Sequence, residues 1–340
     1  MIQVPNNSIM IDVEGFKLSQ QEKILLSHDA IGGVILFTRN YESLEQLHRL
    51  CQEIKAIKSP SLVIAVDHEG GRVQRFQQGF SKIPAMRSLG KMFDQNQDLA
   101  LQLAFATGNI IGYELSKFHI DLNFSPVLDI DLGQSEIIAD RSFHRSSRAI
   151  KDLCYYFIGG LKAQGMSAVG KHYPSHAGTT IDTHLDMAND DRDFEQLEED
   201  LSIYKYLSSA ELLNAVMLSH VIFPKIDHAP VSLSMPWIKK IHDSLGPVFK
   251  FSDDLTMKGL SHFGSMLDLI KKSIQAGNDM AIICNQYENR FHFMNEVEAL
   301  DTEVNRIDEC NLSLDNVDEH EKLENYEKSI KILKENNWLC

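Results

Sequence analysis

Residues 61–72 read Ser-Leu-Val-Ile-Ala-Val-Asp-His-Glu-Gly-Gly-Arg, a short apolar run that ends abruptly in charged and polar residues. Apolar and β-branched residues over this length are typical of a buried strand. Seven further runs of this kind occur along the chain, and longer polar stretches with helical spacing separate them. The predicted strands are 8–13, 33–37, 61–66, 122–128, 168–172, 215–221, 248–252 and 280–284, and examples of the predicted helices are 43–57, 99–115, 150–164 and 194–213.

Strands that alternate with helices predict a parallel sheet. About eight such units in 340 residues favour an α/β fold of the single-domain (β/α)8 TIM barrel type. A doubly wound open sheet is the alternative, but no GxGxxG motif follows an early strand. We expect residues 1–285 to form the barrel catalytic domain. Residues 286–340 are expected to be an acidic, helical C-terminal extension that packs on the barrel or trails from it. The stretch 70–98 is expected to be a loop.

The composition narrows the class of protein. The chain has 48 acidic and 33 basic residues, a net charge of −15, which argues against nucleic-acid binding and adhesion to anionic membranes. No apolar run approaches the roughly 20 residues that span a bilayer, and the start of the chain lacks the pattern of a secretory signal. Five scattered cysteines without a CxxC motif predict neither a disulfide framework nor a structural zinc site. We therefore expect a cytoplasmic protein with no membrane insertion.

Polar residues follow five of the predicted strands directly. Because the carboxyl ends of parallel barrel strands lie at one rim, these side chains are expected to converge on one pocket. Helix capping explains a single case such as Asp254 equally well, but His and Lys are not preferred caps. The residues are Asp67 to Arg72, Asp129 with Asp131, Lys171 with His172, Ser219 with His220, and Ser252 to Asp254.

Residues 171–184 read Lys-His-Tyr-Pro-Ser-His-Ala-Gly-Thr-Thr-Ile-Asp-Thr-His. Asp182 and His184 suit general acid–base chemistry, because a carboxylate orients an imidazole and raises its basicity. A metal site is the alternative, but the stretch has no helical HxxxH pair and no cysteine, so we expect no metal. A second alternative is that this stretch is a surface loop that is rich in histidine without a catalytic role.

The stretch 251–257, Phe-Ser-Asp-Asp-Leu-Thr-Met, places two carboxylates at the end of a buried strand. Cations such as Lys171 and Arg141 can keep such a carboxylate ionised. An ionised, positioned aspartate is a candidate covalent nucleophile. The residues alone thus predict a barrel enzyme with carboxylate and imidazole chemistry, and they leave the substrate open.

These motifs resemble glycoside hydrolase family 3, and within it the NagZ-type bacterial β-N-acetylglucosaminidases (β-hexosaminidases). The Lys171–His184 pattern is specific to the N-acetylglucosaminidase branch, and the stretch from Ser252 to Met257 is a strong family marker. The resemblance extends in the family's order to about Cys284. The similar segments are 33–40, 67–75, 123–129, 140–143, 171–184 and 251–257.

By position, the resemblance implies that Asp253 is the nucleophile and that His184, paired with Asp182, is the acid/base. It implies an exo-acting, retaining β-N-acetylglucosaminidase of cell-wall recycling that releases terminal N-acetylglucosamine from peptidoglycan fragments, namely N-acetylglucosamine-β-1,4-anhydro-N-acetylmuramic acid and its peptides. Such enzymes need no metal or organic cofactor, and we expect a monomer. The residues implied to hold the terminal sugar are Asp67, Arg75, Arg141, Lys171 and His172.

Other activities on the same barrel remain possible from the sequence. A histidine acid/base avoids repulsion between a carboxylate and phosphate, so a β-N-acetylglucosaminide phosphorylase is one alternative. A β-glucosidase is another. Ser175 and Ala177 stand where this branch usually has glycine, and serine and alanine resist backbone conformations that glycine permits. A catalytically impaired amino-sugar-binding protein is therefore the alternative that is not an enzyme.

Overall fold

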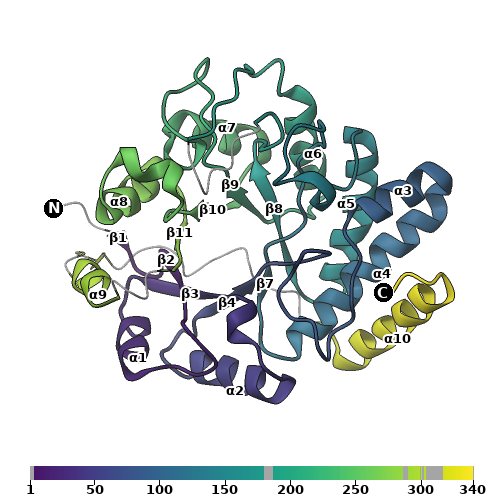
Figure 1. Cartoon of the computed structure of the whole chain (residues 1–340), viewed down its shortest axis with the longest axis horizontal. Coiled ribbons are helices and arrows are strands. Elements are labelled where there is room, and N and C mark those ends of the chain that lie inside the picture. The colour runs from purple at the N-terminus through teal and green to yellow at the C-terminus, as the bar shows by residue number, and fades with distance from the viewer. Residues whose placement is uncertain are drawn as a thin grey trace.

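A closed barrel of eight parallel strands lies at the centre of the molecule (Figure 1). The computed structural model describes residues 4–179, 187–285, 290–298, 300, 302–303 and 317–339. Each barrel strand pairs with the next barrel strand along the chain, and the last pairs with the first. The predicted (β/α)8 barrel is confirmed, and each of the eight predicted runs supplies one strand. The strands are β2 (Ile9–Asp12), β3 (Ile31–Leu36), β4 (Val63–Val66), β7 (Leu122–Asn123), β8 (Ser167–Tyr173), β9 (Ala215–Leu218), β10 (Phe249–Asp254) and β11 (Met280–Ile283).

Helices surround the barrel, and local capping sets where several of them begin. Ser43 accepts a hydrogen bond from the backbone N–H of Gln46 at the start of α2, and Ser265 and Asp268 form a reciprocal capping box at the start of α8. The helices are α1 (Gln20–Leu26), α2 (Leu44–Lys55), α3 (Arg87–Gln95), α4 (Gln97–Ser116), α5 (Ser147–Lys162), α6 (Glu198–Ser209), α7 (Met235–Leu245), α8 (Met266–Ala276), α9 (Arg290–Glu298) and α10 (Glu319–Glu335).

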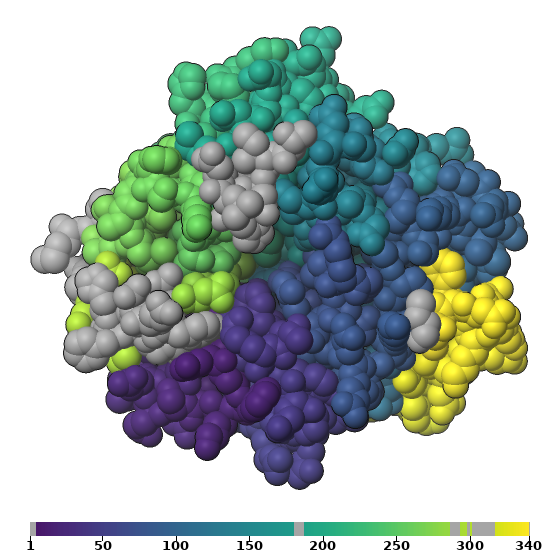
Figure 2. Space-filling model, in the orientation of Figure 1, coloured from purple at the N-terminus to yellow at the C-terminus, as the bar shows by residue number. Residues whose placement is uncertain are grey.

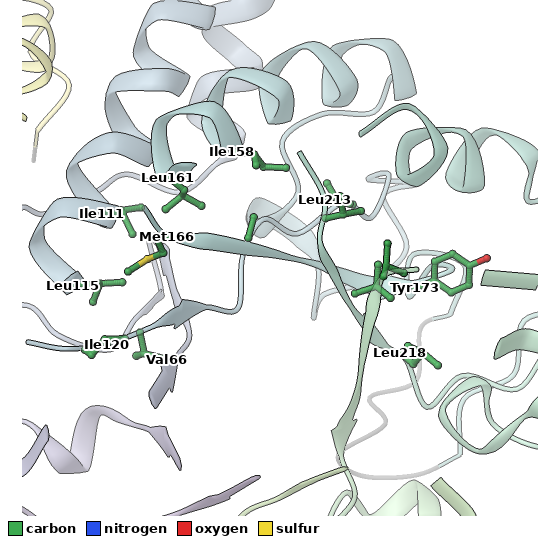
Figure 3. Packing of buried hydrophobic residues seen from close by; sticks show 14 of the residues in the cluster. Val66, Ile111, Leu115, Ile120, Ile158, Leu161, Met166, Tyr173, Leu213 and Leu218 are labelled. Carbon is green, nitrogen blue, oxygen red and sulfur yellow. The ribbon is translucent and has the colours of Figure 1, made fainter. Parts of the chain in front are cut away.

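The strands separate two apolar layers, because successive side chains of a strand point to opposite faces. In β11, Met280 and Ile282 point into the barrel, while Ala281 and Ile283 pack outward against the helices. Figure 3 shows part of the outer layer, in which Ile111 and the other labelled side chains fill the space between helices and strands. This packed interior leaves the carboxyl ends of the strands as the place where polar groups can gather.

One predicted strand is much shorter than expected. The run 122–128 forms β7 over only Leu122–Asn123, and pairing resumes at Val127, which bridges to Lys171. Pro126 lies between the two paired parts and has no N–H to donate to a ladder. The prediction of a continuous strand here is therefore wrong.

The stretch 70–98, expected to be a loop, contains regular structure. β5 (His68–Gly70) and β6 (Val73–Gln74) form an antiparallel hairpin, and β6 lies within this stretch. The helix α3 follows in the same stretch. Gly90 made this stretch look irregular, yet it lies inside α3 where a Cβ would come within 1.9 Å of the Phe143 carbonyl oxygen. The glycine therefore marks close packing of the helix and not a break in it.

The C-terminal helix α10 lies along α4 on the outside of the barrel (Figure 1). Two short strands, β1 (Val4–Pro5) and β12 (Thr302–Glu303), pair in parallel outside the barrel. The division of the chain into a barrel domain and an extension from residue 286 stays a prediction. Within the part of the chain that the structure covers, no helix has both the length and the apolar character needed to cross a bilayer.

Candidate active site

Polar side chains from the carboxyl ends of the barrel strands line one cavity of about 720 Å³. Figure 2 shows a hollow near the centre of the face that is viewed down the barrel. The residues that line the cavity come from segments that are far apart in the sequence. Asp182 and His184, the predicted acid/base pair, lie outside the described residues. The six residues that the resemblance implies for the sugar and the nucleophile line the cavity: Asp67, Arg75, Arg141, Lys171, His172 and Asp253. Asp131 and His220, also expected there, bond instead to Arg87 and to the Ser232 hydroxyl.

Asp67 follows β4 directly and pairs with two cations. Its Oδ1 lies 2.7 Å from Lys171 Nζ, and its Oδ2 lies 3.1 Å from Arg75 Nη2. Burial alone raises the pKa of Asp67, but the two positive charges outweigh burial and hold the pKa well below its usual range. The carboxylate is therefore ionised at neutral pH and can accept hydrogen bonds from the hydroxyl groups of a ligand.

Glu69, on β5, is a second buried carboxylate. It accepts two hydrogen bonds of 2.8 Å from Nε and Nη2 of Arg141, and its Oε1 lies 2.6 Å from Lys171 Nζ. Burial opposes ionisation, but Arg141 and Lys171 lower the pKa of Glu69 to about 2. A bidentate pair of this kind fixes the plane of the guanidinium group.

Lys171 links the two carboxylates into one network. Only 2% of its side chain is exposed, and it touches both Asp67 and Glu69. Three cations, Lys171, Arg75 and Arg141, thus face two carboxylates at one side of the cavity. Fixed charges in a buried site are preorganised, so they can orient a polar ligand without rearranging.

Asp129 orients His172 at the end of β8. Its Oδ2 lies 2.8 Å from His172 Nδ1 and also accepts the His172 backbone N–H at 3.2 Å. Its Oδ1 accepts the backbone N–H of His176 at 2.6 Å. Burial opposes ionisation of Asp129, but these donors hold its pKa below the usual range. The pair makes Nδ1 the proton-bearing nitrogen of His172, which gives Nε2 the acceptor role when the ring is neutral.

The two aspartates at the end of β10 have different surroundings. Asp254 accepts hydrogen bonds from the backbone N–H groups of Thr256 and Cys284 at 3.0 and 3.1 Å and from the Thr256 hydroxyl at 2.8 Å. Burial raises the pKa of Asp254 above its ordinary value. These contacts tie Asp254 to the local backbone, and Asp253 Oδ1 accepts the Asp254 backbone N–H at 2.9 Å. Both carboxylates line the cavity.

The sequence model of the protein family "Glycosyl hydrolase family 3 N terminal domain" matches residues 3–320 of the chain. The chain belongs to glycosyl hydrolase family 3. It is 44% identical over 285 residues to a β-hexosaminidase of Nitrosospira multiformis, covering 82% of this chain and 81% of the relative. A β-hexosaminidase of Neisseria gonorrhoeae is 42% identical over 289 residues, 83% of this chain and 79% of the relative.

Solved structures agree with this family assignment. The crystal structure of NagZ from Neisseria gonorrhoeae in complex with N-trifluoroacetyl-D-glucosamine superposes with a TM-score of 0.86 and 34% identity, and the match covers 98% of each chain. The family 3 chain is therefore a glycosidase of the NagZ-type β-hexosaminidase branch, as its motifs indicated.

Glu69 and Asp129 were expected near the pocket of this family 3 barrel from the sequence, but neither was assigned a role. Both were quoted within motifs, but their roles depend on partners that only the fold supplies. Glu69 meets Arg141 across 72 residues of sequence, and Asp129 meets His172 across 43. The available signal was their position beside polar strand ends, which alone does not distinguish a ligand contact from a supporting one.

The hairpin that carries Glu69, and that begins directly after Asp67, is hydrogen-bonded to the barrel. Asn123 on β7 accepts the His68 backbone N–H at 2.9 Å and donates to the His68 carbonyl oxygen at 3.0 Å. The hairpin turn uses Gly70 and Gly71, whose φ angles are +93° and +56°.

Among the residues with described positions, no group of three or more His, Cys, Asp or Glu is arranged to hold a metal ion.

Proposed function

We propose that this family 3 chain is an exo-acting, retaining β-N-acetylglucosaminidase. Its substrates are peptidoglycan fragments, N-acetylglucosamine-β-1,4-anhydro-N-acetylmuramic acid and its peptides, and its product is the terminal N-acetylglucosamine. The observation that carries the proposal is the single cavity lined by Asp253 together with the charged residues implied to bind the sugar. Its volume lies within the range of roughly 300–1,000 Å³ that is common for small-ligand sites.

The charged network is the proposed site for the terminal sugar. In this proposal Asp67 and the cations Arg75, Arg141 and Lys171 bind hydroxyl and acetamido groups, and His172 contributes its ring. Hydrogen bonds to charged groups are shorter and stronger than those between neutral groups. Several of them around one ring would fix its orientation and favour a chain end over an internal residue. The relative that was solved with N-trifluoroacetyl-D-glucosamine supports an amino sugar as ligand.

The proposed reaction has two steps. In the first, a carboxylate oxygen of Asp253 bonds to the anomeric carbon, the glycosidic C–O bond breaks, and the His184 imidazolium protonates the leaving oxygen. In the second, His184 takes a proton from water, the water oxygen bonds to the anomeric carbon, and Asp253 leaves as a carboxylate. Two inversions give net retention.

The proposed acid/base is a histidine paired with Asp182, where most glycosidases use a carboxylic acid. An imidazole with a pKa near neutrality can serve as acid in the first step and as base in the second. The proposal assigns the enzyme to cell-wall recycling in the cytoplasm, where it would act as a monomer without a metal or organic cofactor.

Product analysis tests this proposal. The purified protein is incubated with N-acetylglucosamine-β-1,4-anhydro-N-acetylmuramic acid, with and without inorganic phosphate, and the sugars are identified by mass spectrometry. The proposal predicts free N-acetylglucosamine in both conditions. Formation of N-acetylglucosamine 1-phosphate as the main product would identify a phosphorylase, and cleavage of nitrophenyl glucoside in preference to nitrophenyl N-acetylglucosaminide would identify a β-glucosidase. Binding without any cleavage would leave an amino-sugar-binding protein.

A further inference from the structure

Glu114, in the last turn of α4, connects two segments that are distant in the sequence. The backbone N–H of Ser81 donates to Glu114 Oε2 at 2.9 Å, and the Ser81 hydroxyl donates to Oε1 at 2.6 Å. The Tyr326 hydroxyl, from the C-terminal helix α10, donates to the same Oε1 at 3.3 Å. One carboxylate therefore holds both the segment after β6 and the C-terminal helix.

The segment that Glu114 holds leads directly to the cavity. The buried side chain of Gln74 donates to the carbonyl oxygens of Phe76 and Ser81 at 3.0 and 2.9 Å and accepts the Ile83 backbone N–H at 2.9 Å. Arg75 follows Gln74 in this folded turn. Its guanidinium group lies 3.1 Å from Asp67 at the cavity wall.

The other end of the connection is the packing of α10 on α4, which Figure 1 shows side by side. The rings of Tyr326 and Tyr113 stack with centroids 4.2 Å apart and an angle of 23° between their planes. Lys117 Nζ lies 4.1 Å from the centroid of Tyr113. Elsewhere on the helix, the Ser329 hydroxyl lies 3.2 Å from Asn109 Oδ1. Tyr326 is thus held firmly beside Glu114.

We propose that Glu114 is a positioning residue for the sugar-binding cavity and that the C-terminal helix supports it through Tyr326. Glu114 holds Ser81, Ser81 and Gln74 fix the turn, and the turn sets the position of Arg75. The inference rests on the proposed function because it takes Arg75 as a ligand of the sugar. The C-terminal helix α10 then contributes to substrate binding, in addition to covering α4.

Two conservative variants test the inference, with a matched control on the same helix. Glu114→Gln keeps the shape but has one acceptor oxygen for three donors, and Tyr326→Phe removes one donor only. Ser329→Ala also alters the contact between α10 and α4, at a position without a bond to Glu114. Steady-state kinetics on a chromogenic β-N-acetylglucosaminide and amide hydrogen exchange of residues 71–83 are measured for each.

We expect Glu114→Gln to raise KM by about 3- to 10-fold and Tyr326→Phe by about 2- to 3-fold, with kcat within about twofold, as the loss of one or two hydrogen bonds predicts. Hydrogen exchange of residues 71–83 is expected to accelerate in both, and Ser329→Ala is expected to match the parent in both measurements. In an Arg75→Ala background, Glu114→Gln is expected to change KM no further, because its effect acts through Arg75.

Unchanged exchange of residues 71–83 in Glu114→Gln would overturn the inference, as would an equal KM effect in the presence and absence of the Arg75 side chain. An equal effect of Ser329→Ala would also overturn it, since a general loosening of α10 would then be the cause. If the parent protein does not cleave the β-N-acetylglucosaminide, the proposed function fails, while the exchange measurement still tests the connection from Glu114 to the turn.

Discussion

Replacement of Glu69 by glutamine removes one negative charge from the charged network at the wall of the cavity. The Glu69 side chain is 1% exposed and holds Arg141 by two hydrogen bonds and Lys171 by one ion pair. Glutamine keeps the shape and one acceptor oxygen but not the charge. In Glu69→Gln, Asp67 alone then compensates the three cations of the network.

The structure indicates the size of the resulting loss in stability. The pKa of Glu69 falls from 4.5 to about 2 because Arg141 and Lys171 stabilise its ionised form. This change corresponds to about 3 kcal/mol of free energy of unfolding. Removing one partner of a buried ion pair costs about 3–5 kcal/mol in other proteins, which agrees with this value. We therefore expect Glu69→Gln to lower the free energy of unfolding by about 3 kcal/mol at pH 7.

The dependence of this difference on pH has a definite sign. A carboxyl with a depressed pKa contributes its full stability above its unfolded-state pKa, near 4.5, and loses it as the pH falls toward about 2. Urea unfolding of the parent and of Glu69→Gln, followed by circular dichroism at several pH values, measures this difference. We expect about 3 kcal/mol at pH 7 and a difference that shrinks steadily below pH 4.5.

A surface variant serves as the control. Glu198 forms an ion pair of 3.0 Å with Lys205, but its side chain is 63% exposed, so Glu198→Gln is expected to cost less than about 1 kcal/mol. The reasoning about Glu69 is refuted if Glu69→Gln costs no more than this control at pH 7. It is also refuted if the difference between the parent and Glu69→Gln is the same at pH 7 and at pH 3.

Three further predictions concern single residues. His184→Ala is expected to slow hydrolysis of a chromogenic β-N-acetylglucosaminide by about 10²–10⁴-fold, and a near-normal rate would contradict its role as acid/base. Asp129→Asn is expected to lower kcat/KM about tenfold, because an amide orients His172 less strongly than a carboxylate does, and unchanged kcat/KM would contradict that role. Gly70→Ala is expected to cost more than about 1 kcal/mol in thermal unfolding, since φ is +93° and a Cβ would lie 2.6 Å from the Pro84 carbonyl oxygen, and unchanged stability would contradict this.

The barrel could be predicted from the sequence because the patterns that indicate its strands and helices are local in the chain. Each strand is a short apolar run, and alternation with helices restricts the topology to a parallel sheet. Pro126 and Gly90 show where local signals mislead. A proline interrupts the pairing of a run that looks continuous, and a glycine that resembles a loop residue lies at a close approach between α3 and Phe143.

For the site, the sequence could predict which strand ends carry polar groups but not how these groups pair. Asp67, Lys171 and Asp253 were predicted from their positions after strands, and they line one cavity. The assignment of Glu69 to both Arg141 and Lys171 depends on distances between segments that are not neighbours in the sequence. The roles of Asp182 and His184 stay predictions, since both lie outside the described residues.

The central claim is that Asp253 bonds covalently to the sugar. The most direct measurement uses a 2-acetamido-2-deoxy-5-fluoro glycosyl donor, which forms a slowly hydrolysed intermediate, followed by proteolysis and mass spectrometry of the labelled peptide. We predict one label per chain, carried by Asp253, and no label in Asp253→Ala. A label on Asp254 or on any other residue, or full turnover by Asp253→Ala, would contradict the account.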